Sequence, residues 1–165
     1  MCISGRDGKH FAQFIRGTQA PPRDMTRAAT SDAHAGNQLF DSIGCNICHV
    51  DTIVTAPAGT VINGGTYSVP AALGNRIIHP PGDFLHDVGT GDGIVQAGPA
   101  DTAYKLRTPP LWGLHIKSRF MHDLESLTLE DAIARHKGEA EHVSHRFRRL
   151  SPEEQQQLLT FLRSL

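Results

Sequence analysis

Aromatic side chains are scarce in this sequence. They make up 6% of its 165 residues, and Trp112 is the single tryptophan. Hydrophobic residues of all kinds account for 39%, which is thin for a chain of this length. The chain therefore has little apolar material from which to build a dense core of its own.

An excess of charge of one sign is also absent, because 16 Lys and Arg residues face 17 Asp and Glu residues. This balance gives no indication of a nucleic acid or another polyanion as a partner. No apolar run reaches the roughly 20 residues that a transmembrane helix requires, so no transmembrane segment is predicted. Ten prolines and 16 glycines predict long irregular stretches within a single domain.

Cysteine occurs three times, and two of the three lie in a C-x-x-C-H motif formed by Cys45, Cys48 and His49. This motif is the attachment signature of a c-type haem. The two thiols can form thioethers to the vinyl groups on one porphyrin edge, which brings the adjoining imidazole under the iron. A redox dithiol would require a βαβ context and a zinc site a second pair of ligands, and neither pattern is present. We therefore expect one covalent haem c, which would also supply the missing apolar core.

Haem c is attached outside the bacterial cytoplasm, so we expect a periplasmic or other extracytoplasmic location. Residues 1–5 contain no apolar segment typical of a signal peptide, so no export signal is visible in this sequence. We interpret the sequence as a mature or truncated form. The remaining cysteine, Cys2, could carry a lipid anchor to a membrane, but the preceding lipobox is absent and a fortuitous thiol is the simpler interpretation.

The chain divides into an N-terminal arm, residues 1–30, and a cytochrome c-type domain, residues 31–165. The arm is expected to contain a short helix at 10–15 and an extended, proline-containing linker at 19–24. The domain is predicted to be mostly α, with helices packed around one covalent haem and joined by long irregular loops.

The central helix of this domain is expected to start at a cap formed by Ser31 or Asp32 and to run through Ile43. Gly44 ends it immediately before the C-x-x-C-H motif. The helix would thus deliver the two cysteines to the porphyrin edge.

Two further helices are predicted toward the C-terminus. Thr128 is the expected cap of a helix that runs from Leu129 to about Lys137. Ser151 begins a capping box for a last helix that extends to Leu165 with one apolar face. A C-terminal helix packed across the haem-delivering helix is the plan of a small cytochrome c.

The segment 50–103 has no helical period. Residues 54–55 and 60–62 could pair as a small β-ribbon. The loop 83–93 is rich in Asp and Gly, and its carboxylates could hold Ca²⁺, but the spacing and terminal Glu of an EF-hand are missing. Turn formation is the simpler explanation of this composition.

The segment 106–113 contains paired prolines and is predicted to be a rigid, extended strap. Arg107 is a candidate partner for a haem propionate, because its guanidinium can donate two parallel hydrogen bonds to a carboxylate. A surface ion pair is the alternative for Arg107. Trp112 is expected to pack against the macrocycle, and an electron relay is the more specific alternative.

From about residue 35 onward, the chain resembles the C-terminal haem domain of the di-haem cytochrome c peroxidase superfamily. Within it, the chain is most similar to the branch of di-haem oxidoreductases, also called thiol oxidoreductases. The matching motifs are CNICH at 45–49, DFLHDVG at 83–89, LRTPPLWG at 106–113, MHD at 121–123, TLEDAI at 128–133, HKGEA at 136–140 and the closing segment 150–165.

Members of this family normally carry two haems, and the one that reacts with peroxide belongs to the N-terminal domain. This sequence has one C-x-x-C-H motif, and residues 1–30 resemble the end of a segment between two domains. The family's His-Asp-Gly motif is replaced by His122, Asp123 and Leu124. The resemblance thus implies the electron-entry half of such a protein without its catalytic half.

Two residues are candidates for the iron ligand opposite His49. In the related peroxidases a methionine follows the helix segment that matches 128–133, and His136 occupies that position here. Met121 is the alternative, and it would give a His/Met site with a raised reduction potential. We expect His136 to be the ligand and His122 to play a supporting, hydrogen-bonding role.

These observations favour an electron-transfer protein, with no catalytic residue assigned, over an enzyme. Two strong ligands leave no vacancy on the iron, whereas a haem peroxidase or oxidoreductase needs an open iron, with His86 or His122 as acid and base. The carrier would serve a redox protein partner or a membrane electron-transfer complex. Its candidate docking patch is basic and consists of Arg135, Lys137, Arg146, Arg148 and Arg149.

Overall fold

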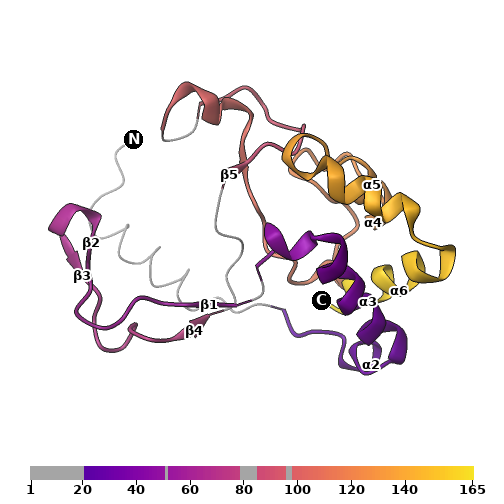
Figure 1. Ribbon diagram of the computed structural model, residues 1–165, viewed down its shortest axis with the longest axis horizontal. Coiled ribbons are helices and arrows are strands. Elements are labelled where there is room, and N and C mark those ends of the chain that lie inside the picture. The colour runs from indigo at the N-terminus through magenta and orange to yellow at the C-terminus, as the bar shows by residue number, and fades with distance from the viewer. Residues whose placement is uncertain (1–20, 51, 79–84, 96–97) are drawn as a thin grey trace.

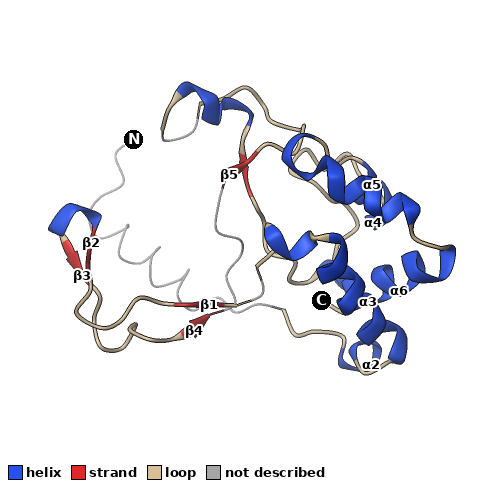
Figure 2. Cartoon of the chain, in the orientation of Figure 1, coloured by secondary structure: helices blue, strands red, loops and turns tan. Residues whose placement is uncertain are grey.

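The computed structural model describes residues 21–50, 52–78, 85–95 and 98–165, so the predicted helix at 10–15 and Cys2 lie outside the described residues. Five α-helices of the described chain gather at one end of the molecule (Figure 1). A long irregular segment with strands of two residues each extends away from them (Figure 2). The prediction of a mostly α domain with long irregular loops is confirmed for the secondary structure.

Helix α3 (Ser31–Ile43) leads directly into the C-x-x-C-H motif. Its cap is Thr30, one residue before the earlier predicted cap, because the Thr30 side-chain oxygen accepts a hydrogen bond from the Ala33 N–H. The helix ends at Gly44, as predicted, and this glycine takes the left-handed conformation with φ of 95°. A 3₁₀ turn, Cys45–Ile47, follows without a break.

Helix α6 (Pro152–Leu162) packs across α3, as the sequence predicts. Its capping box is formed by Ser151 and Glu154, each of which accepts a hydrogen bond from the other's backbone N–H. Gly36 lies where the two helices cross, and a Cβ atom there would collide with the Gln157 backbone carbonyl. The absence of a side chain at Gly36 therefore allows the helices to approach closely.

The hydrophobic core lies between these two helices and extends to the motif. The Phe40 and Phe161 rings meet edge to face with centroids 5.5 Å apart. The Phe40 ring also lies near His49, with a centroid distance of 6.4 Å. The other buried core residues are Ile43, Leu114, Leu129, Phe147, Leu158, Leu159 and Leu162. The core of the helical domain thus supports one side of the candidate proximal histidine.

Helix α4 (Leu129–Ala134) begins at the predicted cap, where Thr128 accepts a hydrogen bond from the Asp131 N–H. It ends at Ala134, short of the predicted end near Lys137. The reason is that the Lys137 N–H bonds to the Val88 carbonyl instead of continuing the helix. His136 consequently lies just beyond the helix end.

Two helices have weak sequence signals. Helix α5 (Glu141–Arg149) buries only Ser144 and Phe147, so its apolar period is faint. Helix α2 (Met25–Ala28) is a single turn within the predicted arm, and Asp24 caps it by accepting a hydrogen bond from the Arg27 N–H.

The strands of the irregular segment pair antiparallel: β1 (Ile53–Val54) with β4 (Ile77–Ile78), and β2 (Val61–Ile62) with β3 (Tyr67–Ser68). The prediction that residues 54–55 pair with 60–62 is therefore wrong. An Asn-Gly-Gly turn follows β2, and its glycines take positive φ angles of 63° and 93°. Asn-Gly is a strong local signal for a hairpin, so the turn directs β2 to the strand after it.

The predicted strap at 106–113 is extended and contains no helix, in agreement with its paired prolines. It begins as strand β6 (Leu106–Arg107), which pairs with β5 (Leu85–His86). In the described part of the Asp- and Gly-rich loop, Asp87 accepts a hydrogen bond from the Gly89 N–H and Asp92 from the Ile94 N–H. Turn formation therefore explains both carboxylates.

The described part of the arm, 21–30, lies against the C-terminus. The Asp24 N–H donates to the Ser164 carbonyl at 3.0 Å, and the Arg23 guanidinium donates to the Ser164 hydroxyl at 3.0 Å. The Gly113 N–H donates to the Leu165 carbonyl at 2.7 Å, so the same terminus also contacts the strap. None of the helices in the described ranges is long and apolar enough to cross a membrane.

Candidate haem-binding site

The C-x-x-C-H motif forms one compact turn. The N–H groups of Cys48 and His49 both donate to the Cys45 carbonyl, at 3.3 and 2.9 Å. Burial raises the pKa of the Cys45 thiol to about 12, so this sulfur is protonated at neutral pH. Redox-active cysteines have lowered pKa values instead. The Cys45 thiol therefore does not resemble that of a reactive redox dithiol.

His49 follows this turn and is neutral at pH 7. Burial of the ring lowers its pKa to about 4, and the nearby His136 lowers it further, while a hydrogen bond to the Pro109 backbone opposes the shift. The neutral imidazole has a nitrogen lone pair available for a metal ion. Since Pro109 belongs to the strap, the strap also fixes the orientation of the ring.

His136 faces His49 from the end of helix α4. Its Nδ1 lies 2.7 Å from the Ala132 carbonyl oxygen, so Nδ1 is the protonated donor and Nε2 carries the lone pair. Burial lowers the pKa of His136 as well. Both rings are therefore neutral at pH 7, and each is oriented by a backbone carbonyl.

The centroids of the two imidazole rings are 6.5 Å apart, and their planes are inclined by 57°. A metal ion bound by one nitrogen from each ring at about 2.0–2.1 Å, with the rings on opposite sides, separates the centroids by roughly 6.3–6.5 Å. The spacing of His49 and His136 therefore fits the ligation of one iron from its two sides.

A cavity of about 560 Å³ opens beside His49. Its volume lies within the range of about 300–1,000 Å³ that is typical of cofactor pockets. The apolar side chains of its lining include Phe40, Leu111, Trp112, Phe161 and Leu165. An apolar surface thus adjoins His49, although His136 is not among the residues that line this cavity. Together with the spacing of the two rings, this surface fits a haem.

The other predicted site residues are Trp112, Arg107, Met121 and His122. Trp112 lines the cavity with 38% of its surface exposed, whereas Arg107 is exposed on β6. Met121 lies in the turn before Ser126 with a positive φ of 63°, and the neighbouring His122 is exposed. Of the two candidate second ligands, His136 has its ring centroid 6.5 Å from that of His49.

Two charged contacts near His136 have no signal in the sequence. The His86 Nδ1 lies 2.8 Å from a Glu139 carboxylate oxygen, and this hydrogen bond lowers the pKa of Glu139. Arg135, expected in the docking patch, forms an ion pair with Asp123 instead. The partners are 53 and 12 residues apart in the chain, and no local periodicity reveals contacts over such separations.

Comparison with known proteins identifies the family of the chain. The family model described as "Di-haem oxidoreductase, putative peroxidase" matches residues 12–165, which include the C-x-x-C-H motif, the strap and all helices from α2 to α6. No curated protein matches the chain. Because the match extends over most of the sequence and agrees with the resemblance of its motifs, the chain belongs to the family of di-haem oxidoreductases.

Proposed function

We propose that the chain binds one haem c and acts as an electron-transfer protein. Cys45 and Cys48 would form the thioethers, and His49 and His136 would bind the iron from opposite sides. The observation that carries the proposal is the pair of neutral imidazoles at a centroid distance of 6.5 Å. The haem would supply a one-electron redox centre, whose potential depends on its axial ligands and its burial.

The surrounding residues would hold this site in order. The Pro109 and Ala132 carbonyls orient the two rings, as carbonyls commonly do for ligating histidines. Trp112 would pack against the macrocycle from the cavity wall, and Arg107 would reach a propionate from β6. Because haem c is attached after export, the proposal includes a periplasmic or other extracytoplasmic location.

A peroxidase or other oxidoreductase with an open iron is the second candidate, and the family description favours it. In that case His136 would not bind the iron, and His86 or His122 would transfer protons. Cyanide and carbon monoxide distinguish the two functions. Rapid binding of either to the purified protein would support the enzyme, and a six-coordinate, low-spin spectrum that is indifferent to both would support the carrier.

The pH dependence of the spectrum follows from the burial of His49. A base whose pKa is lowered in the folded protein keeps its neutral form until the pH falls through the lowered value. Burial lowers the pKa of both His49 and His136, so we expect the low-spin spectrum to persist well below pH 6.5, the ordinary pKa of histidine. An absorption titration measures this, with haem and free imidazole as the control. Loss of the ligand near pH 6.5 would contradict a buried, neutral His49.

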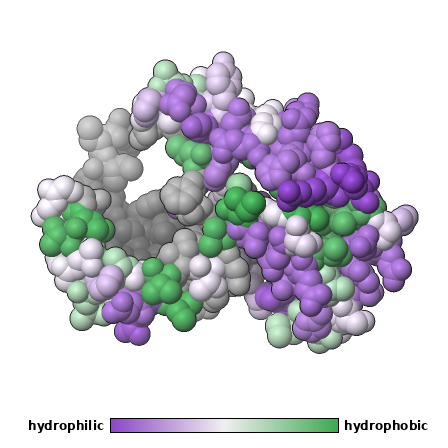
Figure 3. Space-filling model, in the orientation of Figure 1, coloured by the Kyte–Doolittle hydropathy of each residue, from purple (hydrophilic) through white to green (hydrophobic). Residues whose placement is uncertain are grey.

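The partner of the carrier would dock on the basic surface of α5, which is part of the hydrophilic area at the upper right of Figure 3. Arg135 does not belong to this surface, since it is paired with Asp123. Arg146 donates to the Ile43 carbonyl at 3.2 Å, which places its guanidinium at the end of α3, beside the motif. Arg148 and Arg149 are exposed in the last turn of α5.

Reversing Arg148 and Arg149 to Glu is expected to slow association with an acidic redox partner and to leave the haem potential unchanged. Exposed charges are screened beyond about 10 Å at 0.1 M ionic strength, so the wild-type rate should also fall steeply with salt. Stopped-flow electron transfer measures both effects. The control is Arg76→Glu with Lys117→Glu, two exposed cations outside α5. If the electron-transfer rate depended neither on salt nor on the reversal of Arg148 and Arg149, the partner would dock on another surface.

A further inference from the structure

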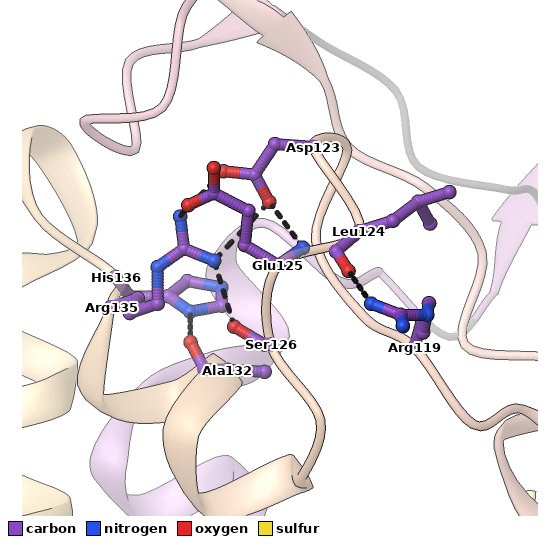
Figure 4. Close-up of polar contacts among 8 residues, drawn as sticks. All are labelled: Arg119, Asp123, Leu124, Glu125, Ser126, Ala132, Arg135 and His136. Carbon is purple, nitrogen blue, oxygen red and sulfur yellow. Dashed lines mark hydrogen bonds and ion pairs between the residues drawn. The ribbon is translucent and has the colours of Figure 1, made fainter.

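Arg135 precedes His136 in the chain and binds three residues of the neighbouring turn (Figure 4). Its two terminal nitrogens reach both oxygens of the Asp123 carboxylate. One of them also donates to the Ser126 hydroxyl at 2.9 Å, and the other to the Glu125 carboxylate at 3.2 Å. The guanidinium thus connects the end of α4 to the turn that contains Asp123.

The ion pair between Arg135 and Asp123 is partly buried. The side chains of Arg135 and Asp123 are only 25% and 24% exposed, and Ser126 is completely buried. The hydrogen bond from Arg135 holds the pKa of the Asp123 carboxyl below its usual range, so the carboxylate is charged at neutral pH. A planar guanidinium that binds both oxygens of a carboxylate fixes orientation as well as distance.

The residues that follow His136 are fixed from the other side. The Lys137 N–H donates to the Val88 carbonyl at 3.1 Å, and the Glu139 N–H donates to the Asp87 carbonyl at 2.8 Å. Helix α4 ends at Ala134, and its carbonyls still hold His136, whose N–H donates to Ile133 at 3.2 Å and whose Nδ1 lies 2.7 Å from the Ala132 oxygen. The contacts of Arg135 on one side and of Lys137 and Glu139 on the other fix where this end of α4 lies.

The turn that Arg135 holds is strained and contains the rival ligand. Met121 and Leu124 both take positive φ angles, 63° and 60°, which side chains other than glycine rarely adopt. Such a conformation persists only where its surroundings impose it. The backbone bridge between Phe120 and Ser126 closes this turn, with the Phe120 N–H donating to the Ser126 carbonyl at 2.9 Å. Side chains add the contacts of Arg135 with Asp123 and Ser126, and that of Arg119 with the Leu124 carbonyl at 3.2 Å.

We propose that Arg135 is a positioning residue for the iron ligand: by tying the turn of Met121 to the end of α4, it fixes His136 as the second ligand in preference to Met121. This inference rests on the proposed function, since it presumes a haem between His49 and His136. It assigns a role to the Asp123–Arg135 pair that neither the motif nor the family description supplies.

The test measures two properties of the Arg135→Gln variant: the carbon monoxide affinity of the ferrous protein and the reduction potential of the ferric/ferrous couple. We expect the fraction of iron that binds carbon monoxide at a fixed subsaturating concentration to rise by about tenfold, because the network that holds His136 is lost. If Met121 replaces His136 instead, the potential rises, and adding Met121→Leu makes the iron accessible to carbon monoxide. Either result shows that His136 has been released.

Further variants separate positioning from folding. Asp123→Asn keeps the volume of the side chain and should give the same change as Arg135→Gln. It therefore tests the inference even where Arg135→Gln fails to fold. Arg135→Lys keeps the charge without the fork and should restore the wild-type potential only in part. The matched control is Arg163→Gln. It removes the 3.2 Å ion pair between Arg163, at the end of α6, and Glu130 of α4, and it should leave the spectrum and the potential unchanged.

Wild-type carbon monoxide binding and potential in both Arg135→Gln and Asp123→Asn would overturn this inference while leaving the proposed function intact. Failure of the proposed function looks different. In that case the wild-type protein carries no covalent haem, or His136→Ala has the spectrum of the wild type.

Discussion

Replacing Cys45 and Cys48 together with alanine is expected to give a colourless protein that does not fold. The apolar residues of the chain are few, and the cavity beside His49 is lined by Phe40, Trp112 and Phe161. Without a covalently held macrocycle this cavity of about 560 Å³ would fill with water, and Trp112 in its wall would stay 38% exposed. Folded domains are stable by only about 5–15 kcal/mol, so the loss of a large part of the core exceeds the available margin.

Haem staining of a denaturing gel and far-ultraviolet circular dichroism measure this outcome. Each single variant, Cys45→Ala or Cys48→Ala, should retain at most one thioether and show weaker staining. Cys2→Ala is the control and should keep both its colour and its helical signal, since Cys2 lies outside the motif. A double variant that is folded like the wild type would show that the helical domain does not depend on the haem.

Replacing His136 is expected to have the second largest effect. His136→Ala removes the ring that faces His49 at a centroid distance of 6.5 Å, so the iron should become open to carbon monoxide. His136→Met should retain a low-spin haem and raise the reduction potential, because His/Met coordination raises it. The increase should be on the order of tenths of a volt, within the range of about 0.8 V that axial ligands span.

Absorption spectroscopy with carbon monoxide and a potentiometric titration measure these changes. His142→Ala is the matched control, because His142 is exposed on α5 and its replacement should leave both readings unchanged. If His136→Ala kept the wild-type spectrum while Met121→Ala lost it, Met121 would be the second ligand. The proximity of His136 to His49 would then not reflect iron binding.

Much of the helical domain can be predicted from the sequence because its signals are local. The end of α3 at Gly44 and the caps at Thr128 and Ser151 each depend on a few neighbouring residues. The C-x-x-C-H motif is equally local, and it specifies the cofactor class through the spacing of its two thiols. The position of His136 was inferred from the family resemblance rather than from a pattern in the residues.

The parts that could not be predicted depend on contacts between distant segments. The end of α4 at Ala134 depends on the Val88 carbonyl, which lies 49 positions before its Lys137 partner (137 − 88). The pairing of β1 with β4 likewise passes over a nearer candidate strand, because the turn after β2 closes a hairpin first. The pairing of Arg135 with Asp123 removes a cation from the predicted docking patch, and only the three-dimensional structure reveals it.

The mass of the intact, denatured protein after expression with export and haem attachment tests the central claim most directly. The account predicts the mass of the polypeptide plus one haem, since two thioethers at Cys45 and Cys48 survive denaturation. The mass of the polypeptide alone, with any colour extracted by acidified acetone, would contradict a covalent haem at this motif.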